Sequence, residues 1–327
     1  MTDTCTMKSD ATPVRTIAGT PSWRSRALAA FGRLALRVPL KSDADIARLR
    51  RLYESLDARY FQPERSVVRE AVTCNGVAAE WISVPQSLPG RVVFYLHGGS
   101  FAFRFPNAHA AFAARLCRRL GARALIPDYR LAPEHPFPAA PDDCLAAYRW
   151  ALAAGCDARG VVFLGDSAGG NLALVTLHRT LRAGEPLPAC AVLLSPAVDC
   201  TLESRSIVDN QGLDPMLSLA DLLVLRHRYL PSAAQYMNPD ASPLFADFAG
   251  LPPLFLQAGS SELLRDEAVR TAQRAHAAGV DVELELWTET PHDFQMIAFL
   301  PEAALAMDRI ARFVFARTGW VPAPAAS

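Results

Sequence analysis

The sequence predicts an α/β protein with a mainly parallel central sheet, helices on both faces and a helical cap. Two observations lead to this prediction. From about residue 66 to residue 318, short apolar runs alternate with segments of helical period, which is the pattern of a parallel sheet covered on both faces. Between Ser195 and Pro252, turn-forming residues and a single convincing helix interrupt the alternation. A long insertion at the strand ends of such a sheet usually builds a lid or a binding pocket.

The first 65 residues precede this alternation. Residues 1–20 are polar, and we expect them to form a disordered tail. Two amphipathic helices are expected next, at Ser25–Leu40 and at Asp43 to about Asp57, because their apolar residues recur at helical spacing. We interpret residues 21–65 as cap helices packed over the main domain. A position on a membrane surface is the alternative, since the first helix is also rich in arginine.

The main domain is expected to span residues 66–318, with a cap insertion at about 200–245 and a tail at 319–327. Its expected strands are Val77–Val84, Arg91–Leu96, Ala124–Asp128, Gly160–Gly165, Ala191–Leu194, Leu254–Gln257 and Val282–Trp287. Its expected helices are Ala108–Leu120, Ala139–Ala154, Leu172–Arg182, Leu217–Tyr229, Asp266–Ala278 and Ala303–Arg317. The last strand alternates apolar and acidic residues. That pattern suits an exposed sheet edge, either protected by its charges or paired with a second copy in a homodimer.

Composition and charge exclude several classes of protein. The 33 Lys and Arg residues balance 33 Asp and Glu residues, so there is no net attraction for nucleic acid or acidic lipid. No apolar run reaches the ~18 residues that cross a bilayer, and the N-terminus lacks the basic-then-apolar order of a secretory signal. The seven cysteines lack C-x-x-C pairing, which suits a reducing compartment. We expect a cytoplasmic protein without a nucleic-acid partner or an integral membrane segment.

The most informative stretch is Gly165–Asn171 (GDSAGGN), which follows the apolar run Val161–Leu164. It predicts a buried strand that enters a sharp turn and then a helix. A G-x-S-x-G turn of this kind holds its serine in a strained, exposed position beside the helix N-terminus. Ser167 is therefore the candidate nucleophile, and the N–H group of Ala168 is a candidate donor to an oxyanion.

A serine nucleophile needs a base and an orienting acid, which in doubly wound hydrolases follow it on loops after later strands. Among the seven histidines, only His292 lies in a loop after a late strand, so it is the candidate base. The acid is expected after the strand Leu254–Gln257. Glu262 lies on that loop and is preferred, while Asp266, one helical turn later, stays open as the alternative.

A second glycine turn follows an earlier strand. In His97-Gly98-Gly99-Ser100, two residues without side chains allow bare backbone N–H groups to approach a substrate. We expect the N–H groups of Gly98, Gly99 and Ala168 to form an oxyanion hole. Loss of one such donor typically costs about 3 kcal/mol of transition-state stabilisation.

These motifs together resemble a known family. The segments His97-Gly98-Gly99, Tyr129–Ala140, Gly165–Asn171 and Pro291-His292 look like those of the hormone-sensitive-lipase-like carboxylesterases. These enzymes are also called bacterial family IV esterases and have the α/β-hydrolase fold. The resemblance covers about residues 66–318. It implies an N-terminal helical cap, a second cap insertion and hydrolysis of short- to medium-chain acyl esters, with no cofactor or metal.

Two residues depart from the family pattern. Many members have aspartate where this chain has Glu262, which keeps Asp266 as a competitor for the role of the acid. Asp293 follows a histidine whose neighbour is more often apolar in the family. Two interpretations stay open: its charge raises the pKa of His292, or its side chain points to water.

The expected partner is a small-molecule ester, bound in an apolar pocket near the cap. The residues expected to line this pocket or its entrance are Phe101, Phe103, Phe105, Met216, Leu217, Leu219 and Leu222. Packing in the protein interior is the alternative explanation for these apolar residues. An amidase or deacetylase would use the same three residues, and nothing in the sequence separates amide from ester. A non-catalytic ligand-binding homologue is a third alternative, and the presence of both Ser167 and His292 argues against it.

Overall fold

The computed structural model describes residues 14–17, 21–35, 40–62 and 64–322. Within these residues nine strands form one sheet in the order β1-β9-β8-β7-β6-β4-β5-β3-β2. Strand β3 runs antiparallel to β2 and to β5, and all other neighbours are parallel. The prediction of a mostly parallel sheet is confirmed.

The bounds of the elements follow the sequence order. The strands are β1 (Val14–Ile17), β2 (Val68–Cys74), β3 (Val77–Ser83), β4 (Val92–Leu96), β5 (Arg123–Pro127), β6 (Val161–Asp166), β7 (Cys190–Leu194), β8 (Leu254–Gly259) and β9 (Val282–Trp287). The helices are α1 (Trp23–Ala35), α2 (Asp43–Tyr60), α3 (Pro106–Leu120), α4 (Ala139–Ala153), α5 (Ala168–Arg182), α6 (Arg205–Asp209), α7 (Leu219–Tyr229), α8 (Arg265–Ala277) and α9 (Pro301–Thr318). Short 3₁₀ turns are η1 (Ala158–Gly160), η2 (Ala233–Gln235), η3 (Pro243–Phe245) and η4 (Phe294–Met296).

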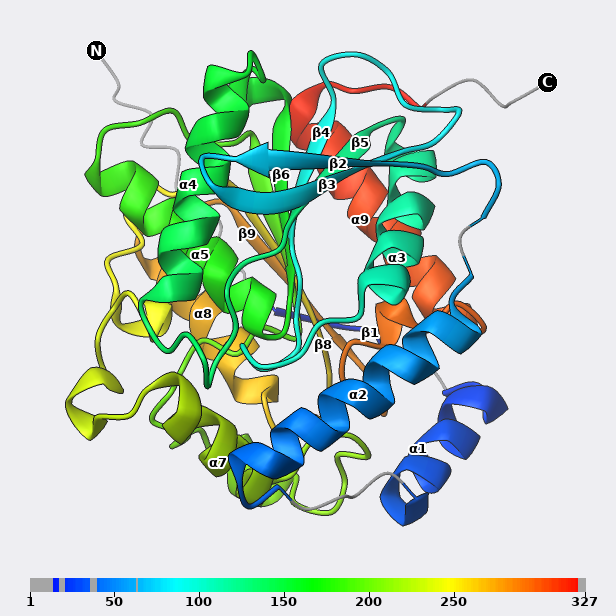
Figure 1. Cartoon of the computed structure of the whole chain (residues 1–327), viewed down its shortest axis with the longest axis vertical. Helices are drawn as coiled ribbons and strands as arrows, with labels where there is room; N and C mark the ends of the chain where they lie inside the picture. Colours follow the sequence, from blue (N-terminus) through cyan, green and yellow to red (C-terminus); the bar gives the residue numbers. More distant parts are fainter. Residues whose placement is uncertain (1–13, 18–20, 36–39, 63, 323–327) are drawn as a thin grey trace, which may run out of the picture.

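Helices cover both faces of the sheet, with α3 and α9 on one face and α4, α5 and α8 on the other (Figure 1). Successive side chains of a strand point to opposite faces, and β4 shows this directly. The Phe94 ring packs 5.6 Å from the ring of Tyr148 on α4, whereas the next residue, Tyr95, packs 5.7 Å from Phe112 on α3. Because both faces are covered, the central strands are apolar throughout and not alternating.

The N-terminal segment corrects one prediction. Residues 1–20 were expected to be a disordered tail, but Val14–Ile17 form strand β1, which pairs in parallel with β9 from Val14 opposite Leu284 to Ile17 opposite Trp287. A run of four residues is too short to stand out from sequence pattern, and its pairing depends on a partner almost 270 residues away. The rest of the expected tail lies outside the described residues.

Strand β9 is consequently not an edge of the sheet, contrary to the interpretation of its alternating charges. One of those charges is buried. Glu285 forms an ion pair with Arg309 and accepts a hydrogen bond of 3.0 Å from Gln257 Nε2. A homodimer stays a prediction.

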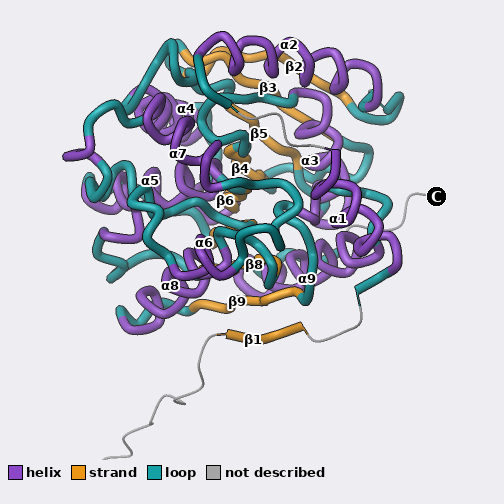
Figure 2. Tube along the Cα trace, turned by 90° about the horizontal axis from the view of Figure 1, so that it is seen from below, coloured by secondary structure: helices purple, strands orange, loops and turns teal. Residues whose placement is uncertain are grey.

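Helices α1, α2, α6 and α7 lie together at one end of the sheet, the lower end in Figure 1 and the near side in Figure 2. Two segments distant in sequence are joined there. The Leu40 N–H donates to Asp221 Oδ1 at 2.8 Å, and Asp43 at the start of α2 forms an ion pair with Arg228 of α7. Buried apolar residues from both segments share one cluster with Phe103 of the main domain. None of the helices in the described ranges is long and apolar enough to span a membrane.

Candidate active site

Ser167 occupies the turn between β6 and α5. Its backbone has φ of +50° and ψ of −118°, a left-handed conformation that is strained for a residue with a side chain. The Ser167 N–H donates to the carbonyl of Leu194 on β7 at 2.8 Å, which fixes the turn. Flanking glycines allow the sharp bend. A Cβ on Gly165 would overlap the Gly169 carbonyl, and one on Gly169 would overlap the carbonyl of Leu96 on β4.

This close approach predicts a stability loss for Gly169→Ala. The overlapping atoms belong to backbone and not to a movable side chain, so we expect the free energy of unfolding to fall by about 3 kcal/mol, measured by urea denaturation. Gly184→Ala is the matched control, because a Cβ there meets open space and only the positive φ of 66° opposes it. That change should cost about 1 kcal/mol. Equal losses in the two variants would contradict the packing argument.

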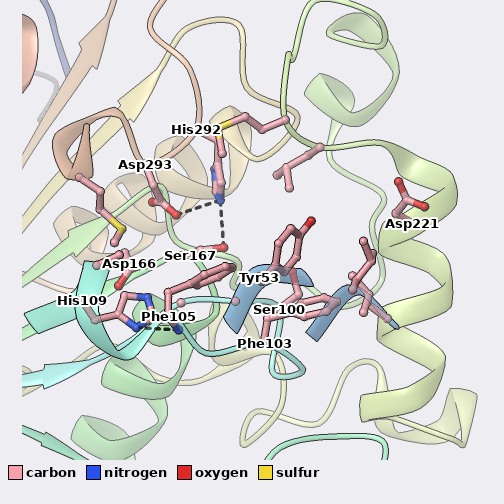
Figure 3. Close-up of a pocket in the computed structure, with 18 of the residues that line it drawn as sticks. Tyr53, Ser100, Phe103, Phe105, His109, Asp166, Ser167, Asp221, His292 and Asp293 are labelled. Carbon is pink, nitrogen blue, oxygen red and sulfur yellow. Dashed lines mark hydrogen bonds and ion pairs between the residues drawn. The ribbon is translucent and has the colours of Figure 1, made fainter. Parts of the chain in front are cut away.

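The structure brings the predicted base and acid to this serine. His292 Nε2 lies 3.0 Å from Ser167 Oγ (Figure 3). On the other side of the ring, His292 Nδ1 lies 2.8 Å from Glu262 Oε2. Each of the three residues follows a different strand of the sheet: Ser167 follows β6, His292 follows β9 and Glu262 follows β8. All three are buried, with exposed fractions of 6% for Ser167, 4% for His292 and 0% for Glu262.

The second oxygen of Glu262 is also fully engaged. Oε1 accepts hydrogen bonds from Ser195 Oγ at 2.8 Å and from the Gly259 N–H. Burial raises the pKa of Glu262, while the hydrogen bond to His292 opposes this effect. These contacts hold the carboxylate in one orientation toward the imidazole.

Asp266, the alternative acid, is not brought to His292. Its Oδ2 accepts from the Ser206 N–H at 2.9 Å and its Oδ1 from Arg265 Nε at 2.8 Å. It lies in the first turn of α8, where an acidic side chain stabilises the helix.

The glycine turn after β4 lies against the same serine. Gly98, Gly99 and Ser100 line a cavity together with Ser167. The backbone of Gly98 lies against the side chain of Asp166, since a Cβ on Gly98 would overlap Asp166 Oδ2. Among the described residues, the N–H groups of Gly99, Ser100 and Ala168 have no protein acceptor. The Ala168 group is the first of the unpaired donors that every helix N-terminus presents.

Ser100 was not predicted as a backbone donor, because only residues without side chains were considered for this turn. The structure shows that Ser100 itself has a positive φ of 54°. The backbone turn therefore continues through Ser100, and the signal available in the sequence was its position directly after two glycines.

Two further carboxyl groups surround the serine. Asp166 Oδ1 accepts a hydrogen bond of 2.7 Å from Tyr95 OH, and burial raises the pKa of Asp166 to about 6. Asp293 Oδ2 lies 3.2 Å from His292 Nε2, and burial raises the pKa of Asp293 well above its usual range. For His292, burial opposes the charged form, but the carboxyl groups of Asp293 and Glu262 outweigh it and raise the pKa to about 10.

A cavity of about 370 Å³ opens above Ser167 and His292. Five of the predicted pocket residues line it, namely Phe103, Phe105, Met216, Leu217 and Leu222. A second cavity of about 50 Å³ also reaches Ser167, and Ala168 and Phe101 line it. The ring of Phe101 stacks on that of Tyr229 at 3.8 Å and forms part of its wall. Leu219 packs against the apolar cluster around Ile207.

No group of three or more His, Cys, Asp or Glu side chains within the described ranges is arranged to hold a metal ion. The six described cysteines are free thiols, and five of them are buried. The reactive groups that the structure places at the site are the Ser167 hydroxyl, the His292 imidazole, the carboxyl groups and the backbone N–H donors.

Comparison with known proteins agrees with this geometry. A family model described as alpha/beta hydrolase fold matches residues 93–296. An acetyl-hydrolase of Streptomyces hygroscopicus is 40% identical over 251 residues, which are 76% of this chain and 83% of the relative. An esterase of Acinetobacter venetianus is 36% identical over 279 residues, which are 85% of this chain and 91% of the relative.

Solved structures extend the similarity to nearly the whole chain. The crystal structure of an esterase from the bacterial hormone-sensitive lipase family matches with a TM-score of 0.85 and 38% identity. The match covers 92% of this chain and all of that one. These relatives are enzymes, which argues against the non-catalytic alternative. The resemblance found in the sequence is confirmed: the chain belongs to the hormone-sensitive-lipase-like family IV esterases of the α/β-hydrolase fold, and it is a carboxylic ester hydrolase.

Proposed function

We propose that the enzyme hydrolyses short- to medium-chain acyl esters through an acyl-enzyme on Ser167. One observation carries the proposal: a hydroxyl, an imidazole and a carboxylate form a continuous hydrogen-bonded chain, 3.0 Å from Ser167 Oγ to His292 Nε2 and 2.8 Å from His292 Nδ1 to Glu262 Oε2. This is the arrangement that activates a serine nucleophile.

In the first step, His292 Nε2 takes the proton of Ser167 while Oγ attacks the carbonyl carbon of the ester. Glu262 accepts the Nδ1–H of His292, which fixes the tautomer and stabilises the imidazolium that forms. His292 then donates the proton to the departing alcohol, and water repeats the attack on the acyl-enzyme.

The negative charge that develops on the ester oxygen needs backbone donors. The N–H groups of Gly99, Ser100 and Ala168 suit this role, because they have no protein acceptor among the described residues. The N–H of Gly98, which the sequence analysis included, stays a candidate donor, and the backbone of Gly98 also lies against the Asp166 side chain. Each donor is worth about a hundredfold to a thousandfold in kcat.

The two cavities suggest how the ester lies. His292 must protonate the alcohol oxygen, and His292 lines the larger cavity but not the smaller one. The alcohol group then occupies the larger cavity, and the acyl group extends past Ala168 into the smaller one of about 50 Å³. This space is much smaller than the 370 Å³ of the other cavity, which favours short acyl chains.

We therefore expect kcat/KM for p-nitrophenyl esters to be highest for acetate to butyrate and to fall by at least about tenfold at palmitate. Ala197→Leu, which fills the smaller cavity, should lower activity on butyrate more than on acetate. Ala108→Leu, in the wall of the larger cavity, is the matched control and should not change that ratio. A steady rise of kcat/KM up to palmitate would contradict the placement of the acyl group.

Covalent labelling tests the nucleophile directly. A fluorophosphonate probe should react with the purified enzyme, and mass spectrometry of the digested protein should locate the adduct on the peptide that contains Ser167. A label on another residue, or no label while the enzyme hydrolyses esters, would remove Ser167 from the mechanism.

Amide hydrolysis by the same residues stays a prediction, tested by parallel assays on a matched ester and anilide. The cytoplasmic location also stays a prediction, which rests on the cysteine usage of the chain.

A further inference from the structure

The nitrogen that must receive the proton of Ser167 has a second neighbour. His292 Nε2 lies 3.0 Å from Ser167 Oγ and 3.2 Å from Asp293 Oδ2 (Figure 3). The other ring nitrogen, Nδ1, is already paired with Glu262 at 2.8 Å. A ring nitrogen of histidine has only one in-plane position, which holds either a hydrogen or a lone pair. Two partners therefore share a single position on Nε2.

The contact between His292 Nε2 and Asp293 Oδ2 requires a proton between the two atoms. With Nδ1–H directed to Glu262, a neutral His292 presents a lone pair at Nε2. An ionised Asp293 also presents only lone pairs, so the two atoms would repel one another at 3.2 Å. A proton between them removes the conflict, either on Nε2 as an imidazolium or on Oδ2 as a neutral carboxylic acid. In both forms the position that accepts the proton of Ser167 is occupied.

We propose that Asp293 is a positioning residue that keeps the resting His292 in a protonated pair, so that Ser167 can be activated only after this pair loses its proton. The proposal rests on the function proposed above, in which His292 is the base for Ser167. It assigns a role to Asp293, which the mechanism proposed above leaves without one.

The surroundings of the pair favour retention of the proton. Three other carboxyl groups face it: Asp166 at the end of β6, Glu262 after β8 and Asp214 from the loop between α6 and α7. Burial is the largest effect that raises the pKa of Asp293, and these three groups raise it further, while His292 opposes them. The hydroxyl of Tyr95 on β4 faces the pair beyond Asp166, to which it donates.

Few cationic side chains lie near the pair of His292 and Asp293 among the described residues. No Lys or Arg is among the described residues that line the cavity. His109 of α3 lines it, but burial lowers the pKa of His109 well below its usual value, so it is neutral. Arg115 of α3 donates to the carbonyls of Gln295 and Met296 and not to a carboxyl group of the site.

The backbone holds Asp293 in this place. Its φ of +51° is left-handed, a conformation that Asn, Asp and Gly adopt most readily. Its N–H group approaches Ser195 Oγ at 3.3 Å, and the same hydroxyl donates to Glu262 at 2.8 Å. Asp293→Asn and Asp293→Gly thus remove the titrating carboxyl group while the turn keeps a compatible residue.

The test is the pH dependence of kcat/KM for p-nitrophenyl butyrate from pH 5 to pH 10. An anion beside an imidazolium stabilises the protonated form, so removal of Asp293 lowers the pKa of His292. We expect the acid limb of the wild-type profile to lie above the ordinary histidine value of ~6.5 and to move down by at least about one pH unit in both variants. The ratio of variant to wild-type activity should then rise as the pH falls. A purely structural role would lower activity by one factor at every pH.

Asp221→Asn is the matched control, because Asp221 lines the same cavity but bonds to Leu40 and Ser218 and not to the triad. It should leave the acid limb in place. The rate of Ser167 labelling by a neutral fluorophosphonate, measured over the same pH range, should shift as kcat/KM does. If the labelling rates of the wild type and of both Asp293 variants have the same pH midpoint, the role of Asp293 is overturned and the proposed function is not. Absence of labelling at any pH would instead overturn the proposed function. If a thermal melt shows that one Asp293 variant does not fold, the pH profile of the other variant decides.

Discussion

Replacement of Ser167 by alanine is expected to lower kcat for p-nitrophenyl butyrate by a factor of about 10⁴ to 10⁶. The change deletes only the hydroxyl, whose hydrogen-bond partner among the described residues is His292. The backbone donors and both cavities remain, so substrate binding should persist while the covalent step is lost.

The fold should tolerate this change. Serine and alanine carry the same Cβ, so the strain of φ at +50° is equal in both, and the melting temperature should stay within a few degrees. Ser261→Ala is the matched control, since Ser261 lies on the acid loop and its hydroxyl only donates to the Thr290 carbonyl at 3.3 Å. Its kcat should change by no more than about threefold. Retention of a tenth of the wild-type activity by the Ser167 variant would rule out the acyl-enzyme on this residue.

Glu262→Gln is expected to lower kcat by about 10³ to 10⁴, which is the effect of removing the charge of the orienting acid in other serine hydrolases. If the amide oxygen keeps the donors Ser195 and Gly259, the NH₂ group must face His292 Nδ1. An NH₂ group only donates, so it would force Nδ1 to accept and place the hydrogen on Nε2. In that tautomer His292 cannot take the proton of Ser167.

Asp266→Asn provides the comparison for this prediction. Asp266 pairs with the Ser206 N–H and with Arg265, so the change should leave kcat within about a factor of five and lower stability only slightly. Thermal melts of both variants separate a loss of chemistry from a loss of folding. A larger loss of kcat for Asp266→Asn than for Glu262→Gln would move the role of the acid to Asp266.

The parts of the site that could be predicted from sequence are those fixed by local chain geometry. Ser167 lies in a turn whose glycines, Gly165 and Gly169, are required by contacts within a few residues or with the adjacent strand. Glu262 follows the buried strand β8, and His292 follows β9, in which apolar and acidic residues alternate. Parallel strands end at the same edge of the sheet, so residues after them meet in space even when they are far apart in sequence.

Other features depend on side-chain directions or on distant partners, which sequence patterns do not encode. The contact between the Asp166 side chain and the backbone of Gly98 was not predicted. Strand β2 was not recognised, because most of its residues are exposed or partly exposed and it lacks a regular apolar alternation. Helix α5 begins at Ala168, four residues earlier than predicted, because two glycines suggested a longer turn.

Leu40 bonds to Asp221 and Asp43 pairs with Arg228, so two distant stretches of the chain are joined on the cap side of the larger cavity. Leu40 and Leu49 of the first stretch and Asp221 and Leu225 of the second line this cavity. The reacting groups, in contrast, all lie on loops that follow strands of the sheet. We therefore expect selectivity for the alcohol group to depend mainly on these two stretches, and reactivity to depend on the loops of the sheet. Substitution of cap residues such as Leu49 or Leu225 should change which alcohol groups fit the larger cavity, while the catalytic residues keep their geometry.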